Sequence, residues 1–239
     1  MPNSSLDIKT NLELVRQRVD SAAARAGRDP KAITLIAVSK TKPWQMVACA
    51  IAHEQKDFGE NTIQDALTKI PNTRNQSDIH WHFIGPLQSN KTKHVPGNFQ
   101  WLHTLESEKI AQRLENTCAE IGKILSVLVQ VNIANDPAKK GLKTDALDAF
   151  VDALLIQQLQ YIKLRGLMTI GAVDADEPTR RSWFAGLREL QKDIAGKFNL
   201  PDFNQLSMGM SDDFEEAIEE GATMVRVGST IFGKRDVKV

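Results

Sequence analysis

The feature that most constrains the fold of this chain is a repeated alternation of short apolar segments with helical ones. The first apolar segment, residues 33–38, is β-branched and typical of a strand buried on both faces. Seven further strand candidates follow, at residues 56–59, 80–85, 101–105, 124–132, 164–170, 205–210 and 223–228. Helical patterns fill most of the intervals, at residues 44–53, 62–70, 107–122, 145–155, 179–197 and 212–221, with a short candidate at 90–95. Strands that alternate with helices predict parallel βαβ units.

Eight such units in 239 residues match the size of a (β/α)8 barrel. We therefore predict an α/β fold, a single TIM barrel over about residues 33–235, with an open doubly wound sheet as the competing architecture. Apolar residues at helical spacing predict an extra N-terminal helix over about residues 6–26, which Gly27 and Pro30 end. This helix is expected to pack outside the barrel or across its bottom. Because no linker or repeat interrupts the pattern, residues 1–239 are predicted to form one domain.

Composition narrows the class of protein. Thirty basic and thirty acidic residues give a net charge of zero, which argues against nucleic-acid or membrane-surface partners. The two cysteines, Cys49 and Cys118, are no disulfide framework and indicate a reducing compartment. The start of the chain lacks a signal-peptide pattern, and no apolar stretch could span a bilayer. We expect a cytoplasmic globular protein; the net charge carries no information on oligomeric state, and a monomer is the expectation.

Lys40 is the sharpest candidate for chemistry. In a barrel of this class, active residues lie at the carboxyl ends of the strands and in the loops that follow. Lys40 directly follows the strand at 33–38, so its amine is expected to reach the barrel mouth. Partial burial and the neighbouring cation of Lys42 would lower the pKa of that amine, as a Schiff-base lysine requires. A solvated lysine in a loop is the alternative interpretation.

Two later loops favour a phosphate group. Residues 226–230 leave the last strand with backbone donors and hydroxyls, and residues 207–212 end the preceding strand in a similar way. Barrels often bind phosphate at these two loops, although such turns also occur as ordinary loop and helix-cap chemistry. Together with Lys40, the loops indicate a phosphate cofactor that carries an aldehyde. The basic pair Lys139 and Lys140 is either a solvated loop or a further contact for an anion.

The histidines raise a metal site as the alternative chemistry. His80 and His82 alternate onto one face of a strand, and His103 lies within the next strand. No carboxylate accompanies them at a strand end, however, so packing or hydrogen bonding by His82 is favoured over metal ligation.

Six motifs together resemble a known family. They are Ala-Val-Ser-Lys-Thr-Lys-Pro at 37–43, Phe-Gly-Glu-Asn at 58–61, Trp-His-Phe-Ile-Gly-Pro-Leu-Gln-Ser-Asn-Lys at 81–91, Leu-Arg-Gly-Leu-Met at 164–168, Leu-Ser-Met-Gly-Met-Ser-Asp-Asp at 206–213 and Val-Arg-Val-Gly-Ser-Thr-Ile-Phe-Gly at 225–233. The chain resembles the YggS/PROSC family, the pyridoxal 5′-phosphate homeostasis proteins, from about residue 33 to residue 235. Two positions depart from the family, which often has tyrosines where this chain has Thr62 and Val237.

The resemblance implies a barrel like the N-terminal domain of alanine racemase, with pyridoxal 5′-phosphate (PLP) as its cofactor and no metal. Lys40 would hold PLP as a Schiff base, and Arg226 would face the pyridine nitrogen, which it leaves unprotonated because a guanidinium keeps its proton. The phosphate would be held by Ser207, Ser211, Gly228 and Ser229. Asn61 and His82 would line the surroundings of the ring, and Lys139 falls where the family has a lysine implicated in secondary cofactor handling.

The resemblance also implies a role without catalytic turnover. Family members bind PLP and hand it over, which affects intracellular vitamin B6 and amino-acid balance, so PLP-dependent apo-enzymes are the expected receivers. The alternative is a PLP-dependent amino-acid racemase of low activity, and a third interpretation is a metal-dependent hydrolase that uses His80 and His82. Racemization in the related enzymes needs a second base, a tyrosine. The only tyrosine here, Tyr161, precedes the sixth strand, and His82 is the other candidate.

Overall fold

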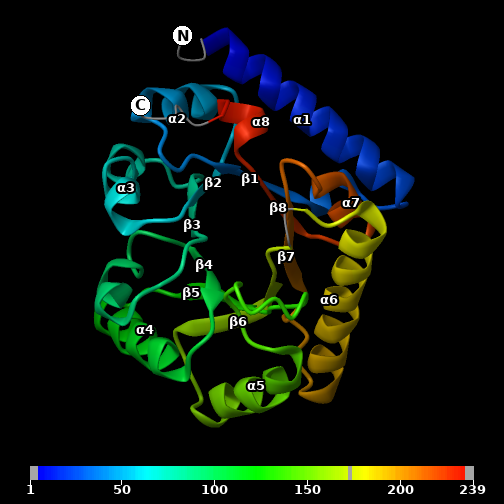
Figure 1. Ribbon diagram of the computed structural model, residues 1–239. Coiled ribbons are helices and arrows are strands. Elements are labelled where there is room, and N and C mark those ends of the chain that lie inside the picture. Colours follow the sequence, from blue (N-terminus) through cyan, green and yellow to red (C-terminus); the bar gives the residue numbers. More distant parts are fainter. Residues whose placement is uncertain (1–4, 172–173, 235–239) are drawn as a thin grey trace.

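The structure is a computed structural model that describes residues 5–171 and 174–234. Eight parallel strands pair in chain order, and the first also pairs with the last, so the sheet closes into a barrel (Figure 1). Helices fill the connections and surround the strands. The predicted (β/α)8 barrel is confirmed, and the open doubly wound sheet is wrong. The predicted end of the barrel at residue 235 and the departure at Val237 lie outside the described residues.

The elements have the following bounds. The strands are β1 (Thr34–Val38), β2 (Asp57–Glu60), β3 (His80–Phe83), β4 (Trp101–Leu105), β5 (Leu125–Gln130), β6 (Ile162–Met168), β7 (Gln205–Met210) and β8 (Met224–Val227). The α-helices are α1 (Ser5–Arg25), α2 (Trp44–Ala52), α3 (Ile63–Leu67), α4 (Glu108–Ile121), α5 (Leu147–Ile156), α6 (Glu177–Lys197), α7 (Phe214–Glu219) and α8 (Ser229–Phe232). Short 3₁₀ helices are η1 (Pro30–Ala32), η2 (Ile70–Thr73), η3 (Ser89–His94) and η4 (Thr144–Ala146).

The predicted element bounds differ from the observed ones mainly near the barrel mouth. The sixth strand, predicted at 164–170, spans Ile162–Met168, and the third, predicted at 80–85, ends at Phe83. In both cases the apolar run continues beyond the strand because Ile84 and Ile170 line a cavity there instead of extending the sheet. The helix predicted at 62–70 divides into α3 and η2, since Pro71 cannot continue an α-helix.

Two apolar layers hold the barrel together. The larger lies between the strands and the surrounding helices, and it takes in almost all the buried apolar side chains. A smaller cluster consists of Ile36, Leu128, Met168 and Met224, each from a different strand. The same barrel also buries polar side chains, among them His82, His103, Ser207 and Arg226. The barrel is therefore only partly filled by apolar residues, and polar side chains occupy part of its interior.

Helix α1 packs along the outside of the barrel, over α2, α7 and α8 (Figure 1). Its buried face repeats at helical spacing and comprises Ile8, Leu12, Val15, Val19, Ala22 and Ala23. The predicted helix at 6–26 is confirmed within one residue at each end, and of the two expected positions it takes the outer one.

Two further expectations concern the environment of the chain. Cys49 and Cys118 are free cysteines, so the described structure contains no disulfide. A search of the described residues found no helix with both the length and the apolar character needed to cross a membrane.

Candidate functional site

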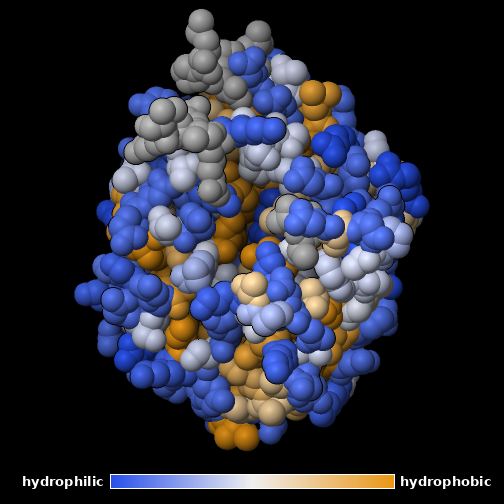
Figure 2. Space-filling model, in the orientation of Figure 1, coloured by the Kyte–Doolittle hydropathy of each residue, from blue (hydrophilic) through white to orange (hydrophobic). Residues whose placement is uncertain are grey.

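A cavity of about 450 Å³ opens at the carboxyl ends of the strands. It is the hollow near the centre of the face in Figure 2, where apolar surface shows between polar rims. A volume of this size suits a small organic ligand. Six of the eight residues that the sequence predicts for the site line this cavity: Lys40, Asn61, Ser211, Arg226, Gly228 and Ser229.

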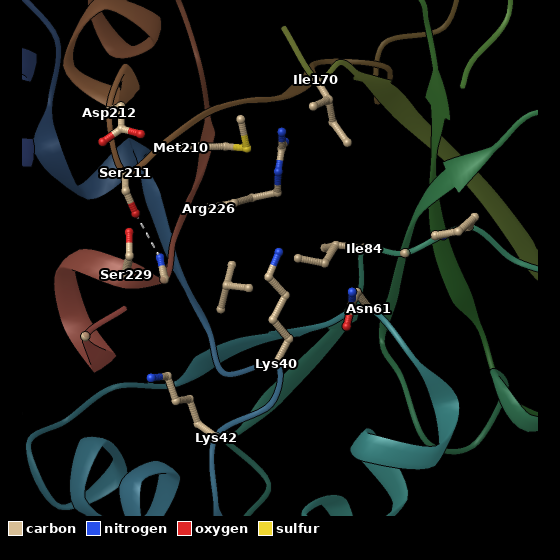
Figure 3. A pocket seen from close by; sticks show the side chains of 15 residues that line it. Lys40, Lys42, Asn61, Ile84, Ile170, Met210, Ser211, Asp212, Arg226 and Ser229 are labelled. Carbon is tan, nitrogen blue, oxygen red and sulfur yellow. Dashed lines mark hydrogen bonds between the residues drawn. The ribbon is translucent and has the colours of Figure 1, made fainter. Parts of the chain in front are cut away.

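Lys40 enters the cavity from the loop after β1 and is half-buried. Figure 3 shows its amine directed toward the side of the cavity from which Arg226 extends. The next residue, Thr41, has a φ of 64°, which is uncommon for a residue with a side chain. Its backbone N–H donates to Oδ2 of Asp65 at 2.6 Å, and this contact holds the turn. The neighbouring residues thus fix the base of the Lys40 side chain.

A buried ionic cluster lies directly behind that turn. The ammonium of Lys69 donates to Oε1 of Glu60 at 2.7 Å and to the carbonyl of Ser39 at 2.8 Å, and it lies 3.0 Å from Oδ1 of Asp65. The hydroxyl of Ser39 donates to the same Glu60 oxygen at 2.6 Å. Burial raises the pKa of the Glu60 carboxyl to about 7, and the Lys69 charge only partly offsets this. The cluster clamps the residues on either side of Lys40.

The sequence reasoning did not single out Lys69 as part of the site. The one signal for it was the spacing of Asp65 and Lys69, which lie four residues apart and therefore on one helical face. That spacing occurs on most exposed helices and could not have indicated a buried pair.

The two loops predicted to hold an anion meet at one wall of the cavity. The N–H of Gly228 donates to the Ser211 hydroxyl oxygen at 3.2 Å, the dashed line in Figure 3, and Ser229 follows at the start of α8. Because the Ser211 oxygen accepts this bond, its own proton can be donated toward the cavity. Lys40, Lys42 and Arg226 give the cavity cationic groups, against the carboxylate of Asp212. The wall is suited to an anion.

Asn61 lines the cavity through a close approach of two loops. A Cβ added at Gly85 would lie 2.0 Å from the backbone oxygen of Asn61, so only glycine fits there. Ile84, Ile170 and Met210 complete the lining with apolar side chains. The cavity therefore combines apolar walls with a few polar groups.

Arg226 lies on β8 and is 4% exposed. Its Nη1 donates to the Ser207 hydroxyl at 2.6 Å, and its Nη2 donates to the carbonyl of Thr169 at 2.8 Å. Burial lowers the pKa of the guanidinium to about 10, and the nearby carboxylate of Asp213 acts against that shift. Arg226 thus remains a cation at neutral pH.

Ser207 and His82, the other two predicted residues, lie outside the lining of the cavity. The Ser207 hydroxyl contacts Arg226 and His103, and both Ser207 and His82 have no exposed surface. The register of β7 and β8 shifts between Ser207 and Met210, and Gly209 has a φ of 88°. Ser207 lies within β7, whereas Ser211 follows its end at the mouth, so the two serines differ in depth although alternation along a regular strand would place them on one face.

The remaining chemical candidates have separate positions. His80 and His82 both contact Oδ1 of Asp57, at 3.3 Å and 3.0 Å. Within the described residues, no group of three or more histidine, cysteine or acidic side chains could hold a metal ion. Lys139 and Lys140 line a smaller cavity of about 220 Å³ that shares Ile84, Pro86 and Ile170 with the main one.

Comparison with known families and sequences gives a consistent result. The family described as alanine racemase, N-terminal domain, matches residues 10–236. The pyridoxal phosphate homeostasis protein of Escherichia coli K12 is 42% identical over 233 residues, which cover 96% of this chain and 97% of that protein. The protein of the same name from Pseudomonas aeruginosa is 44% identical over 229 residues, covering 96% of each chain.

Solved structures are similar over nearly the same length. PipY of Synechococcus elongatus with PLP bound has a TM-score of 0.79 and 32% identity, covering 90% of this chain and all of that one. Its PLP-free form has a TM-score of 0.81 and 34% identity, covering 91% and 99%. An alanine racemase of Clostridium difficile has a TM-score of 0.73 at 13% identity and is covered over 58% of its length, which shows a common fold.

Proposed function

The chain belongs to the alanine racemase N-terminal domain family and, within it, to the pyridoxal phosphate homeostasis proteins, and on that premise we propose that it binds pyridoxal 5′-phosphate in the cavity at the barrel mouth. The family expected from the motifs is confirmed. One observation carries the assignment of the site: a lysine amine, a buried guanidinium and two serine hydroxyls from adjacent loops line the same cavity (Figure 3).

The donor set of the cavity fits the cofactor group by group. The hydroxyls of Ser211 and Ser229, with the backbone of the β8–α8 turn, suit a phosphate dianion. The apolar side chains of Ile84, Ile170 and Met210 suit the faces of an aromatic ring. Arg226 offers N–H donors to a ring nitrogen and holds its own proton, because its pKa stays near 10.

Lys40 is the residue that would hold the cofactor covalently. Its amine, once deprotonated, would be the nucleophile that attaches the aldehyde of PLP covalently, with the loss of one molecule of water. The clamp of Glu60, Lys69 and Asp65 around the loop keeps the side chain aimed into the cavity. When bound, the cofactor supplies an electron-accepting ring, and Arg226 limits that capacity by leaving the ring nitrogen unprotonated.

We propose a carrier role without catalytic turnover, in intracellular PLP and amino-acid homeostasis. Two observations support it. Tyr161, the only tyrosine of the chain, lies immediately before β6, at the end of the barrel opposite the cavity. His82, the other candidate for a second base, lies outside the cavity lining. Neither residue lines the cavity in which a ligand at the mouth would lie.

The proposal extends to the surroundings of the protein. PLP-dependent apo-enzymes are the proposed receivers of the cofactor, since the open mouth leaves the ligand within reach of other proteins (Figure 2). We further propose a cytoplasmic monomer in which residues 1–239 form one domain; the two free cysteines suit a reducing compartment.

The test is an absorbance spectrum of the full-length protein with PLP, followed by borohydride reduction and peptide mass spectrometry. We expect a visible band and a reduced adduct on the peptide that contains Lys40. Lys40→Ala should abolish that adduct, whereas Lys42→Ala should retain it. Lys42 is a matched control because it lines the same cavity, while its amine donates to the carbonyl of Lys234.

Two results would contradict the proposal. If the wild-type chain gives no band or adduct with added PLP, the cofactor assignment is wrong. If the adduct persists in Lys40→Ala, the covalent site lies elsewhere.

A further inference from the structure

A continuous hydrogen-bonded chain crosses the barrel behind the cavity. Nη1 of Arg226 contacts the hydroxyl of Ser207 at 2.6 Å, and that hydroxyl contacts Nδ1 of His103 at 2.8 Å. Nε2 of His103 lies 3.0 Å from Nδ1 of His82, and Nε2 of His82 lies 3.0 Å from Oδ1 of Asp57. Since Asp57 begins β2 and Arg226 lines the cavity, the chain joins opposite ends of the barrel.

The two ends of this chain, together with the neutral state that burial favours for both imidazoles, determine the direction of every bond in it. A guanidinium can only donate, so Ser207 accepts from Arg226, and its own proton is available for donation to Nδ1 of His103. His103 then accepts at Nδ1 and donates from Nε2 to His82. His82 in turn accepts at Nδ1 and donates from Nε2 to the carboxylate of Asp57, which can only accept. Each of the two neutral imidazoles therefore carries its proton on Nε2.

Packing and charge around the chain agree with this order. The ring of His82 stacks on that of Trp101, with centroids 5.9 Å apart and planes within 6°, which fixes its orientation. His82 and His103 have no exposed surface, and burial lowers the pKa of both imidazoles. The titratable and charged groups that face the hydrogen-bonded chain are Asp57 and His80 at one end and Arg226 and Asp213 at the other.

Arg226 needs such support because it is a buried cation. Among the described residues, no carboxylate lies within ion-pair distance of its guanidinium. A buried charge without a partner is costly, and a chain of aligned hydrogen bonds that ends on a carboxylate reduces that cost. The bonds to Ser207 and Thr169 use two of the five N–H groups and fix the plane of the guanidinium.

We propose that His103 and His82 are positioning residues, which act through Ser207 to hold Arg226 in place for the ligand of the cavity. The proposal rests on the proposed function, since the ring of PLP is the ligand that Arg226 would face. It assigns to Ser207 and His82 a role behind the cavity in place of direct contact with PLP.

The direction of the hydrogen bonds from Arg226 to Asp57 is testable on the protein without PLP. Nitrogen-15 NMR of the five histidines distinguishes the two neutral tautomers and the charged form. We expect two histidines to be neutral at pH 7 with the proton on Nε2, and His103→Gln and His82→Gln to assign them. A proton on Nδ1 of either residue, or a charged imidazole at pH 7, would overturn the proposed order.

The effect of the histidines on PLP binding is tested by comparing two variants. His103→Leu removes two hydrogen bonds of the network, and His80→Asn is the control. The control residue also contacts Asp57 but lies outside the chain and is about half exposed. We expect His103→Leu to weaken PLP binding roughly tenfold, about the effect of one hydrogen bond, and to move the absorbance maximum of bound PLP. His80→Asn should match the wild type in both.

Two milder variants, His103→Gln and Ser207→Ala, separate the loss of a hydrogen bond from a failure to fold. His103→Gln retains one donor and one acceptor and should recover most of the affinity. If His103→Leu does not fold, Ser207→Ala removes the first link by deleting a single hydroxyl and should give the same loss. Wild-type affinity and spectrum in a folded His103→Leu or Ser207→Ala would overturn the positioning role. If the wild type itself binds no PLP, the proposed function fails, and the NMR result still decides the order of the chain.

Discussion

At the scale of single residues, the structure departs most from expectation in its buried charges. Lys69 and Glu60 are 1% and 0% exposed, yet they form an ion pair directly behind the loop of Lys40. The second oxygen of Glu60 has no hydrogen-bond partner in the described structure. A buried carboxylate in this condition is costly when charged, because a single oxygen carries all the compensating contacts.

The Glu60 pair leads to a prediction about pH. Burial raises the pKa of Glu60 from 4.5 to about 7, so the folded state binds this proton more tightly than the unfolded state does. Its contribution to stability is fully present below pH 4.5 and is lost as the pH rises through 7. The free energy of unfolding of the wild type should fall by about 2 to 3 kcal/mol relative to Glu60→Gln between pH 5 and pH 8.

Urea unfolding of both proteins at several pH values measures this difference. The two buried histidines have lowered pKa values and change stability in the opposite direction as the pH falls, but they are common to both proteins and cancel. Parallel stability curves would mean that Glu60 is not strained by burial.

At the scale of elements, residues 206–213, which the sequence indicates as a strand end and loop, also determine how closely β7 and α7 pack. Gly209 has a φ of 88°, and a Cβ there would lie 2.5 Å from Cβ of Ala217 and 2.9 Å from Cα of Phe214. The strand and the helix that follows it therefore approach closely only because this residue is glycine. The same bend separates Ser207, which faces the barrel interior, from Ser211, which faces the cavity.

Gly209→Ala should lower the free energy of unfolding by about 2 kcal/mol or more, because α7 must move away and the backbone conformation becomes strained. Gly196→Ala is the matched control. Gly196 lies in α6 with no atom within 4 Å of an added Cβ, so this variant should be more stable by up to about 1 kcal/mol. Chemical denaturation measures both, and equal effects of the two changes would show that the contact at Gly209 is unimportant.

At the scale of the whole molecule, α1 braces the part of the barrel that carries the anion-binding loops. It packs over α7 and α8, and the side-chain amide of Asn11 donates to the carbonyl of Ile231 in α8. Arg18 and Arg25 pair with Glu215 and Glu219 on α7. Because these ion pairs are partly exposed, we attribute most of the stability of this contact to its apolar face.

Leu12→Ala should therefore destabilise the protein by about 2 to 5 kcal/mol, the range for a leucine removed from a packed core. Leu14→Ala, on the same helix but 52% exposed, should change stability by less than about 1 kcal/mol. Thermal unfolding of the two variants gives the comparison. A small effect at Leu12 would mean that α1 contributes little to the folded barrel.

The sequence by itself determined the alternating strands and helices that favour a barrel, the N-terminal helix, and the candidate residues Lys40, Ser211, Gly228 and Ser229 at the mouth, whereas the outer position of that helix came from the structure. Strand and helix periods are local properties of the chain, and the rule that barrel sites follow the strands converts them directly into positions. Only the tertiary structure decided that Ser207 and His82 lie behind Arg226, that Asp57 accepts the last hydrogen bond of their network, and that Lys69 is buried. These contacts join residues of different strands, and their partners depend on register shifts and depth in the barrel, which no pattern along the chain encodes.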